Sequence, residues 1–491
     1  MLFNSFTYLV FLPIVVALYW VLPAIARRVM LLIASYVFYM HWKPAYGLLI
    51  FGLTIANFFF GIAIDRWKPQ RKPILTAALL FNLGSLCFFK YADFLLKSVF
   101  DLLHFSGSVF GFSNAIPANS PALNILLPLG ISFFTFEFIH YLVDVYRGAK
   151  PLTNFWWFAL FAAFFPSQIA GPIKRFQDFD EQLKANHKFD PVLFKEGLAL
   201  IFVGLFKKMV LGDNLGHVVA IGFNNVAQMG TLDAWLAAIG FTIQIYIDFS
   251  GYTDIGRGSA QLLGFRLPPN FNWPFLSHSL TEFWRRWHIS LSTWLRDYLF
   301  IPMGGSRVSN WKLKRNLFIT MALGGLWHGA DWHYVIWGVF HGTGLVFSKD
   351  WSDLVDRTPF LKRMQPHPLW HCSGVIFVFV FLIFAGILFR STDVPQALHV
   401  ASRLFTLAPS YGVIHSFAIS TLPFSITAYS IYLIAEQLAK RASTTTVPVV
   451  SQVVSFWNSS LPARLATYAT IALTIMGFAP EEVAPFIYFQ F

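Results

Sequence analysis

The sequence has little charge. Only 12% of its 491 residues are Asp, Glu, Lys or Arg, about half the share that an average soluble domain carries. Hydrophobic residues make up 56% of the chain and its mean hydropathy is +0.57, which argues against a string of soluble domains. The 56 Phe and 17 Trp exclude a disordered chain, because disordered segments are poor in aromatic residues. The composition therefore predicts a polytopic membrane protein.

Cysteine and acidic residues are also scarce. The two cysteines, Cys87 and Cys372, provide neither a disulfide framework nor the spacing of metal ligands, and we expect them to fill small apolar spaces. The 36 Lys and Arg exceed the 24 Asp and Glu, which leaves a net charge of +12. In a membrane protein such a surplus marks loops on the cytoplasmic side. Nucleic acid is therefore not expected as a partner.

Apolar runs recur along the whole chain, and about 20 such residues span a bilayer as a helix. The long runs are 6–23, 45–64, 74–96, 124–143, 233–251, 373–389, 415–435 and 464–490. Shorter or interrupted runs are 29–41, 98–112, 155–171, 192–211, 316–327 and 333–348. We therefore expect an all-α fold of about ten to fourteen membrane helices. Some of them are re-entrant, a form that persists at membrane depth where protein or a water-filled cavity surrounds it.

The basic loops predict an orientation in the membrane. Arg27-Arg28 follow the first apolar run instead of preceding it, which is typical of a retained helix and not of a signal peptide. Two predicted spans separate this pair from the basic run 66–72, so both loops can lie in the cytoplasm. The N-terminus is then outside. The basic stretches 303–315, 357–363 and 440–441 are further candidates for the cytoplasmic side.

Ionisable residues beside apolar runs concentrate between residues 244 and 345, where each costs free energy unless it is paired or wetted. In Gln244–Asp254, two carboxylates and four hydroxyl groups follow an apolar run. One interpretation is a helix end capped by Gly251, with Asp254 starting the next turn. The other places Asp248 and Asp254 in a polar cavity, where they orient a histidine or bind a partner loop.

The stretch Phe283–Tyr298 alternates Trp with Arg. On a continuous helix, Arg285, His288, Ser292 and Arg296 fall within about 80° of one another, and Trp residues occupy another face. An amphipathic helix in the membrane interface explains the Arg and Trp residues. It explains His288 and the hydroxyl groups less well.

The third polar stretch is Asn316–His333, in which an apolar run reaches Gly324-Gly325 and then Trp327-His328-Gly329. Glycine allows close approach of another backbone or a ligand, and a histidine can accept a proton at neutral pH. For His333 and His341 we favour hydrogen-bonded residues of the core. The spacings among these histidines, 5 and 8 residues, do not place two ligands on one helix face, so no metal site is predicted.

At these residues the chain resembles the membrane-bound O-acyltransferase (MBOAT) family, most of all its bacterial alginate O-acetylation (AlgI-type) branch, with the teichoic-acid D-alanylation protein as a cousin. The resemblance extends over about residues 125–350. The motifs that carry it are Gly171-Pro172-Ile173, Asp248-Phe-Ser-Gly-Tyr-Thr-Asp254, Phe271-Asn272-Trp273-Pro274, Phe283–Ser292 and Trp327-His328-Gly329. It predicts a single integral-membrane domain, 1–491, with N-terminal helices in 1–124, the catalytic core in 125–350 and C-terminal helices in 351–491.

The resemblance implies a ring of membrane helices around a central tunnel that is open to both sides. His328 matches the position regarded as catalytic, and His288 matches a second polar residue that faces the tunnel. Further candidates for binding substrate or lining the tunnel are Asp248, Ser250, Asp254, Arg285, Arg286, Ser292, Arg296 and Trp327. The implied donor is cytoplasmic acetyl-coenzyme A, a substrate and not a bound cofactor. The implied acceptor is an exported, alginate-like polysaccharide, reached directly or through a periplasmic SGNH/esterase-like partner.

The residues suit this chemistry, because histidine can act as a base or carry an acyl group, and a site inside the membrane excludes bulk water. The arginines, with Lys312, Lys314 and Arg315, suit either the phosphates of coenzyme A at a cytoplasmic mouth or lipid headgroups. Two other functions stay open. One is a sibling MBOAT that acylates a teichoic acid or a lipid, and the other is a transporter of a solute or lipid-linked sugar. No inverted repeat supports the transporter.

Overall fold

The computed structural model describes residues 1–110, 122–168, 171–185, 187–410 and 460–478, together with six single positions between 412 and 430. Every regular element in these ranges is a helix, which confirms the all-α class. The predicted span 415–435 lies almost entirely outside the described residues, and so do residues 479–490 of the last one.

In chain order, with η marking a short 3-10 or π segment, the helices are α1 (Phe6–Val21), α2 (Ala24–Met40), α3 (Pro44–Arg66), η1 (Lys68–Gln70), α4 (Arg71–Leu86), η2 (Cys87–Tyr91), α5 (Ala92–Phe110), α6 (Ile131–Tyr146), α7 (Phe155–Ala163), η4 (Phe165–Ser167), α8 (Phe176–Lys184), α9 (Pro191–Leu205), η5 (Phe206–Gly212), α10 (Asp213–Asn224), η6 (Val226–Gln228), α11 (Thr231–Leu262), η7 (Pro274–Leu276), α12 (Leu280–Arg286), α13 (Ile289–Leu295), η8 (Arg296–Phe300), α14 (Asn310–His328), α15 (Trp332–Arg357), α16 (Pro359–Met364), α17 (Pro368–Arg390), α18 (Val394–Arg403) and α21 (Leu461–Phe478).

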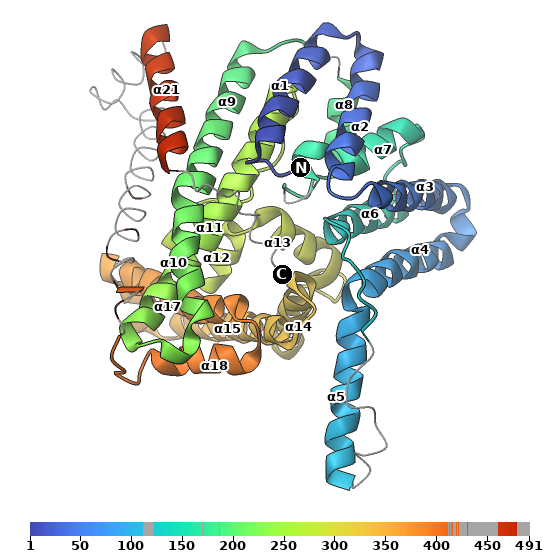
Figure 1. Cartoon of the computed structure of the whole chain (residues 1–491). Coiled ribbons are helices and arrows are strands. Elements are labelled where there is room, and N and C mark those ends of the chain that lie inside the picture. Colours follow the sequence, from blue (N-terminus) through green and yellow to red (C-terminus); the bar gives the residue numbers. More distant parts are fainter. Residues whose placement is uncertain are drawn as a thin grey trace.

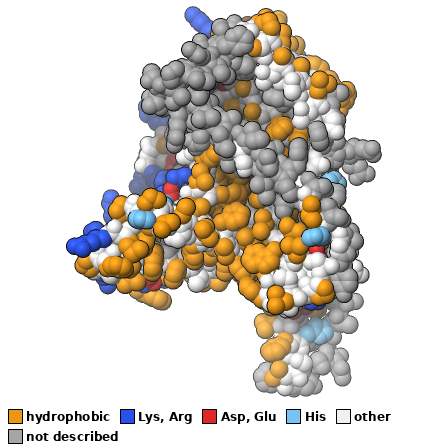
Figure 2. Space-filling model, turned by 90° about the vertical axis from the view of Figure 1, so that its left-hand side faces the viewer, with side chains coloured by type: hydrophobic (Ala, Val, Ile, Leu, Met, Phe, Trp, Pro, Cys, Tyr) orange, Lys and Arg blue, Asp and Glu red, His pale blue; other side chains and the backbone are white. Residues whose placement is uncertain are grey.

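Four helical stretches of the described chain are long and apolar enough to cross a bilayer on their own, and they are Pro44–Arg66, Lys68–Val109, Thr231–Leu262 and Pro368–Arg390. Two shorter apolar helices, Phe6–Val21 and Phe155–Ser167, accompany them. The second lies in a run predicted to be short or interrupted, whereas the first lies in run 6–23, one of the runs predicted to span the bilayer. Figure 2 shows hydrophobic side chains over the middle and lower part of one face, with Lys and Arg side chains at its edge. Cys87 and Cys372 are exposed, so the prediction that they fill apolar space inside the protein is wrong.

Several predicted runs differ from the helices that form. Runs 74–96 and 98–112 join into one helical path, in which the π segment η2 connects α4 to α5. Figure 1 shows α5 turning away at this point and extending from the rest of the molecule. Run 124–143 begins as a helix only at Ile131. Apolarity alone marks neither a π segment nor an extended stretch, because both keep the hydrophobic composition of the run.

Helices α9 and α11 pack closely because glycines face each other at two levels. A Cβ atom on Gly204 would lie 2.6 Å from the carbonyl oxygen of Gly251, and one on Gly258 would lie 2.5 Å from that of Gly197. Small residues let the backbones of membrane helices approach in this way. Helix α11 continues through Gly251 to Leu262, so the interpretation of Gly251 as a helix cap is wrong.

The lower part of the molecule in Figure 1 is formed by α14, α15, α17 and α18, beneath the upright α9 and α11. Helices α14 and α15 are in close contact, since a Cβ atom on Gly325 would lie 2.7 Å from the Cα atom of Gly338. The pair also contacts α12 and α17. These helices meet where His328 ends α14, and this meeting point positions the candidate site.

Candidate active site

Helix α14 presents His328 as its last residue. Gly329 follows in an extended conformation, and a Cβ atom there would lie 2.0 Å from the ring of Tyr334. A larger residue at 329 would therefore displace Tyr334 at the start of α15. Helix α14 thus ends within the tripeptide Trp327-His328-Gly329, and the missing side chain at Gly329 leaves space for the ring of Tyr334.

The side chain of His328 is buried against aromatic rings and lines a cavity of about 50 Å³. Its ring lies 4.9 Å from the rings of Trp327 and Trp337, centre to centre, and 5.2 Å from that of Phe389. The same cavity is lined by Trp284 and His341. His328 therefore faces a small, mostly aromatic chamber.

Three histidines lie close to tryptophan rings at this site, and two of them, His328 and His341, line the chamber. The ring of His288 lies 6.4 Å from that of Trp327. On the other side, the rings of Trp337 and His341 lie 4.5 Å apart. The structure therefore brings His288 and His328 close to the same ring, that of Trp327, and it adds His341, which the sequence pattern assigned to the core.

His288 does not lie in the middle of a helix. Helix α12 ends at Arg286 and α13 begins at Ile289, and His288 between them adopts a left-handed conformation with φ +41°. The predicted continuous helix over 283–298 is therefore wrong, and with it the common face of Arg285, His288, Ser292 and Arg296. A left-handed conformation costs a residue with a Cβ atom about 1–2 kcal/mol, so surrounding contacts must hold it.

Asn270 supplies these contacts. Its carbonyl oxygen accepts a hydrogen bond from the backbone N–H of Ile289 at 2.9 Å, and its side-chain Oδ1 accepts one from the hydroxyl of Ser290 at 2.7 Å. The Ser290 hydroxyl oxygen in turn accepts from the backbone N–H of Ile173 at 3.1 Å. Both ring nitrogens of His288 are buried and have no hydrogen-bond partner among the described residues. The turn is thus fixed from outside, and the imidazole itself is left available.

A larger cavity of about 640 Å³, which we call the first cavity because it lies beside the first half of α14, contains three of the predicted residues. Arg285, Ser292 and Arg296 line it, although they belong to different helical segments. Trp284 lines both this cavity and the chamber at His328. Arg286 lines neither, and its guanidinium instead forms an ion pair with Glu282 at 2.5 Å.

A third cavity, of about 410 Å³, lies beyond the end of α14. Gly329, Lys90, Asp331, His333 and Arg390 line it. The ammonium group of Lys90 donates to the backbone carbonyls of Trp327 and, at 3.2 Å, His328. Sequence analysis missed Lys90, although a lysine within the apolar run 74–96 is the kind of signal that marks a functional position in a membrane protein.

The remaining predicted residues form a separate polar centre on α11. Lys208 bridges Asp213 at 2.6 Å and Asp248 at 2.8 Å, and Lys207 pairs with Asp254 at 2.8 Å. The Ser250 hydroxyl donates to the Ile247 carbonyl at 3.3 Å. Asp248, Ser250 and Asp254 do not line any of the three cavities described above, so their predicted role at the tunnel is untested.

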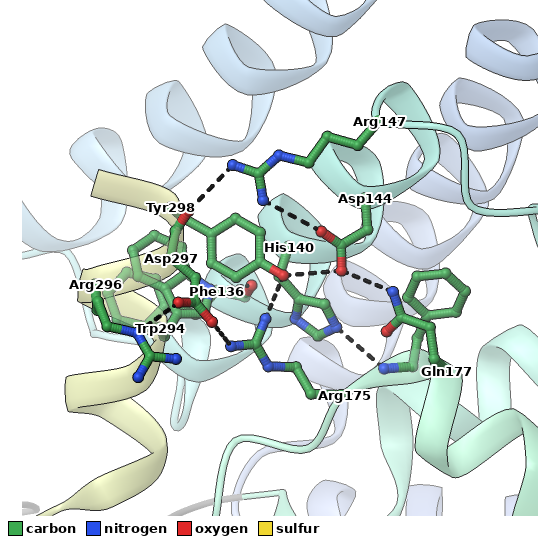
Figure 3. A network of polar contacts seen from close by, with 11 residues as sticks. Phe136, His140, Asp144, Arg147, Arg175, Gln177, Trp294, Arg296, Asp297 and Tyr298 are labelled. Atoms are coloured by element: carbon green, nitrogen blue, oxygen red, sulfur yellow. Dashed lines mark hydrogen bonds and ion pairs between the residues drawn. The ribbon is translucent and has the colours of Figure 1, made fainter. Parts of the chain in front are cut away.

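A polar network joins Arg175, which follows the Gly171-Pro172-Ile173 motif closely in the sequence, to the residues after α13 (Figure 3). Arg175 forms an ion pair with Asp297 at 2.6 Å, and Tyr298 donates to Asp144 of α6 at 2.8 Å. Nearby, the indole N–H of Trp294 donates to the carbonyl of Phe136 at 3.0 Å. Motifs far apart in the sequence are thus tied into one frame around α13.

Fold and site together define a polytopic α-helical membrane protein with a buried histidine between cavities. No group of three or more potential metal ligands occurs among the residues that the structure describes. The model of the membrane-bound O-acyltransferase family matches residues 74–391. The chain belongs to this family and is an O-acyltransferase.

Curated relatives place the chain within the family. It is 36% identical to the probable alginate O-acetylase AlgI of Azotobacter vinelandii over the full length of both chains. It is 40% identical to the protein of the same name in Pseudomonas aeruginosa, over 84% of this chain and 75% of the relative. A peptidoglycan O-acetyltransferase of Helicobacter pylori is 33% identical, over 83% of this chain and 80% of that protein.

Proposed function

We propose that this protein takes acetyl from cytoplasmic acetyl-coenzyme A and passes it across the inner membrane to an exported, alginate-like polysaccharide. Transfer is direct or proceeds through an extracytoplasmic partner of the SGNH/esterase type. The names of the two relatives called probable alginate O-acetylases support acetyl as the acyl group and a polysaccharide as the acceptor.

The observation that carries the proposal is the place of His328 among the three cavities. The cavity lined by Arg285 and Arg296 lies beside the first half of α14, the chamber contains His328, and the third cavity begins at Gly329. A helix of 19 residues is about 28 Å long, close to the hydrocarbon thickness of a bilayer. An acyl group held at His328 is thus near the end of a path along α14.

The charges support entry of the donor at the first cavity. Arg285 lines it and forms no ion pair among the described residues, and Lys314 at the start of α14 pairs with Asp350 at 2.5 Å. Arginine binds phosphate with charge-assisted hydrogen bonds, so the phosphates of coenzyme A fit this end. By the positive-inside rule, the basic start of α14 faces the cytoplasm.

The chamber suits acyl transfer at His328. A neutral imidazole can deprotonate a hydroxyl group or carry the acetyl group itself. The aromatic walls keep bulk water away, which protects the thioester from hydrolysis. His288, whose ring lies 6.4 Å from that of Trp327, is the second residue that we assign to the reaction.

We expect His328→Ala to abolish acetylation of the exported polymer, because the variant loses the imidazole that acts as base or carrier at the end of α14. The measurement is mass spectrometry of the polymer from cells that express each variant at equal membrane levels. The exposed His371 gives the matched control, and His371→Ala should acetylate normally. Full polymer acetylation by His328→Ala would refute the role of His328.

A further inference from the structure

The helix that carries His328 ends without a cap from the residue that follows it. The last four carbonyl groups of a helix have no partner within the helix, and a following residue in the left-handed conformation often allows the chain to satisfy them. Gly329 is extended instead. Because a carbonyl group without a hydrogen bond is costly inside a membrane protein, the end of α14 needs donors from another part of the chain.

Two consecutive side chains of the π segment η2 supply these donors. The hydroxyl of Tyr91 donates to the carbonyl of Leu326 at 2.9 Å. The ammonium group of Lys90 donates to the next two carbonyls, those of Trp327 and, at 3.2 Å, His328. Three of the last four carbonyls of α14 are thus capped by two neighbouring residues that lie about 235 positions earlier in the chain.

The positive charge of Lys90 suits this place. The aligned peptide dipoles leave a partial negative charge at the end of a helix, and hydrogen bonds from a charged donor are about twice as strong as neutral ones. The ammonium nitrogen also lies over the ring of Trp327, 5.8 Å from its centre, where a cation is attracted to the aromatic face. The same ring lies 4.9 Å from that of His328. Lys90 therefore contacts both the backbone of His328 and the ring beside its imidazole.

We infer that Lys90 and Tyr91 are positioning residues for acyl transfer, because they fix the end of α14 and with it the place of the His328 imidazole in the chamber. This inference rests on the proposed function and deepens it. A lysine inside an apolar run costs free energy unless it is paired or wetted, and both hydrogen bonds that Lys90 donates among the described residues go to α14. A π segment such as η2 is rare in proteins and occurs often at functional sites.

The test uses the full chain in lipid nanodiscs, where thiol release from acetyl-coenzyme A gives kcat and KM. A displacement of about 1 Å can lower a rate about 100-fold, so Lys90→Met should lower kcat by about that factor and change KM less than about twofold. Lys90→Arg still presents a charged donor and should keep kcat within about tenfold of the wild type. Tyr91→Phe loses one neutral hydrogen bond, which contributes less than a charged one, and should lower kcat about fivefold.

Two substitutions elsewhere are the matched controls. Lys97 is exposed on α5, and the hydroxyl of Tyr46 donates to the carbonyl of Leu126, which lies outside α14. Lys97→Met and Tyr46→Phe should therefore keep kcat within about twofold of the wild type.

Hydrogen–deuterium exchange measures the cap without the reaction. In Lys90→Met the end of α14 should open more often, so the amides of residues 325–328 should exchange about tenfold faster while those of α11 keep their wild-type rates. Equal acceleration in α11 would overturn the inference, because Lys90 would then support the whole fold instead of one helix end.

The kinetic outcomes separate this inference from the proposed function. An unchanged kcat in Lys90→Met, or a loss in Lys90→Arg as large as that in Lys90→Met, overturns the positioning role while the function stands. Full polymer acetylation by His328→Ala refutes the proposed function instead, and the exchange of residues 325–328 still reports whether Lys90 caps α14.

Discussion

At the scale of single residues, the cations near the first cavity differ in whether they already form an ion pair with a carboxylate. Arg285 and Arg286 are neighbours in the sequence and have the same chemistry. The guanidinium of Arg286 is held by Glu282, whereas Arg285 lines the cavity without an ion pair among the described residues. A ligand phosphate thus meets an available guanidinium only at Arg285. Sequence alone cannot separate the two, because the difference lies in the direction of each side chain.

We predict that Arg285→Ala raises the KM for acetyl-coenzyme A about tenfold with little change in kcat. A hydrogen bond to a charged group contributes about 1.5–3 kcal/mol, and about 1.4 kcal/mol corresponds to a factor of ten. The assay is thiol release at varied donor concentration in nanodiscs. Arg286→Ala is the paired comparison and should change KM less than twofold. Equal effects of both variants would argue for lipid contacts at this edge instead of donor binding.

At the scale of helices, the buried ion pairs between η5 and α11 hold two long elements together. The side chains of Lys208, Asp213 and Asp248 are each no more than 5% exposed. Removing one partner of a buried ion pair costs about 3–5 kcal/mol, because the remaining charge stays buried without compensation. The Asp248 motif therefore has a structural explanation that does not involve the substrate.

Substitution of Lys208 tests this explanation. Lys208→Met should destabilise the protein by about 3–5 kcal/mol, seen as a clear fall in Tm in detergent. Lys184, whose side chain is 59% exposed beside Asp180, offers the control, and Lys184→Met should change stability by less than about 0.5 kcal/mol. If Lys208→Met kept its Tm but lost acyl transfer, the α11 carboxylates would belong to the tunnel, as the other interpretation holds.

At the scale of the whole molecule, charge on the loops sets the orientation. The helical path Lys68–Val109 begins beside the basic run 66–72, and α16 carries Lys362 and Arg363 in its last turn. Because Lys and Arg are retained on the cytoplasmic side, both loops should face the cytoplasm. The first cavity then opens toward the cytoplasm and the third toward the outside.

Cysteine labelling measures this orientation. In a chain with Cys87→Ser and Cys372→Ser, the variants Lys72→Cys and Lys362→Cys should resist a membrane-impermeant maleimide in intact spheroplasts. Both should react fully after permeabilisation, because both side chains are exposed. Labelling of either site in intact spheroplasts would contradict the orientation and, with it, the assignment of the donor side.

The site shows how far sequence reasoning extends. Trp327-His328-Gly329 singles out a histidine that the structure places in the aromatic chamber, because a glycine after a polar residue in an apolar run is a local signal. The helix break at His288 is not local, since the contacts that hold it come from Asn270 and, through Ser290, from Ile173. The position of Lys90 is likewise not a local property, because its ammonium group reaches the carbonyl of His328 only where the helical path through η2 packs against the end of α14.

The sequence by itself determined that this is a membrane protein, that its fold is helical and that His328 is the candidate histidine, because composition and short motifs depend only on neighbouring residues. Tertiary structure decided which polar groups face cavities and which neutralise one another. Arg285 and Arg286 lie side by side in the chain, yet only packing directs one guanidinium to a cavity and the other to a carboxylate. An unpaired charge in the membrane interior costs free energy, so each charged group must pair or reach a cavity. Which of the two happens depends on residues that are remote in the chain.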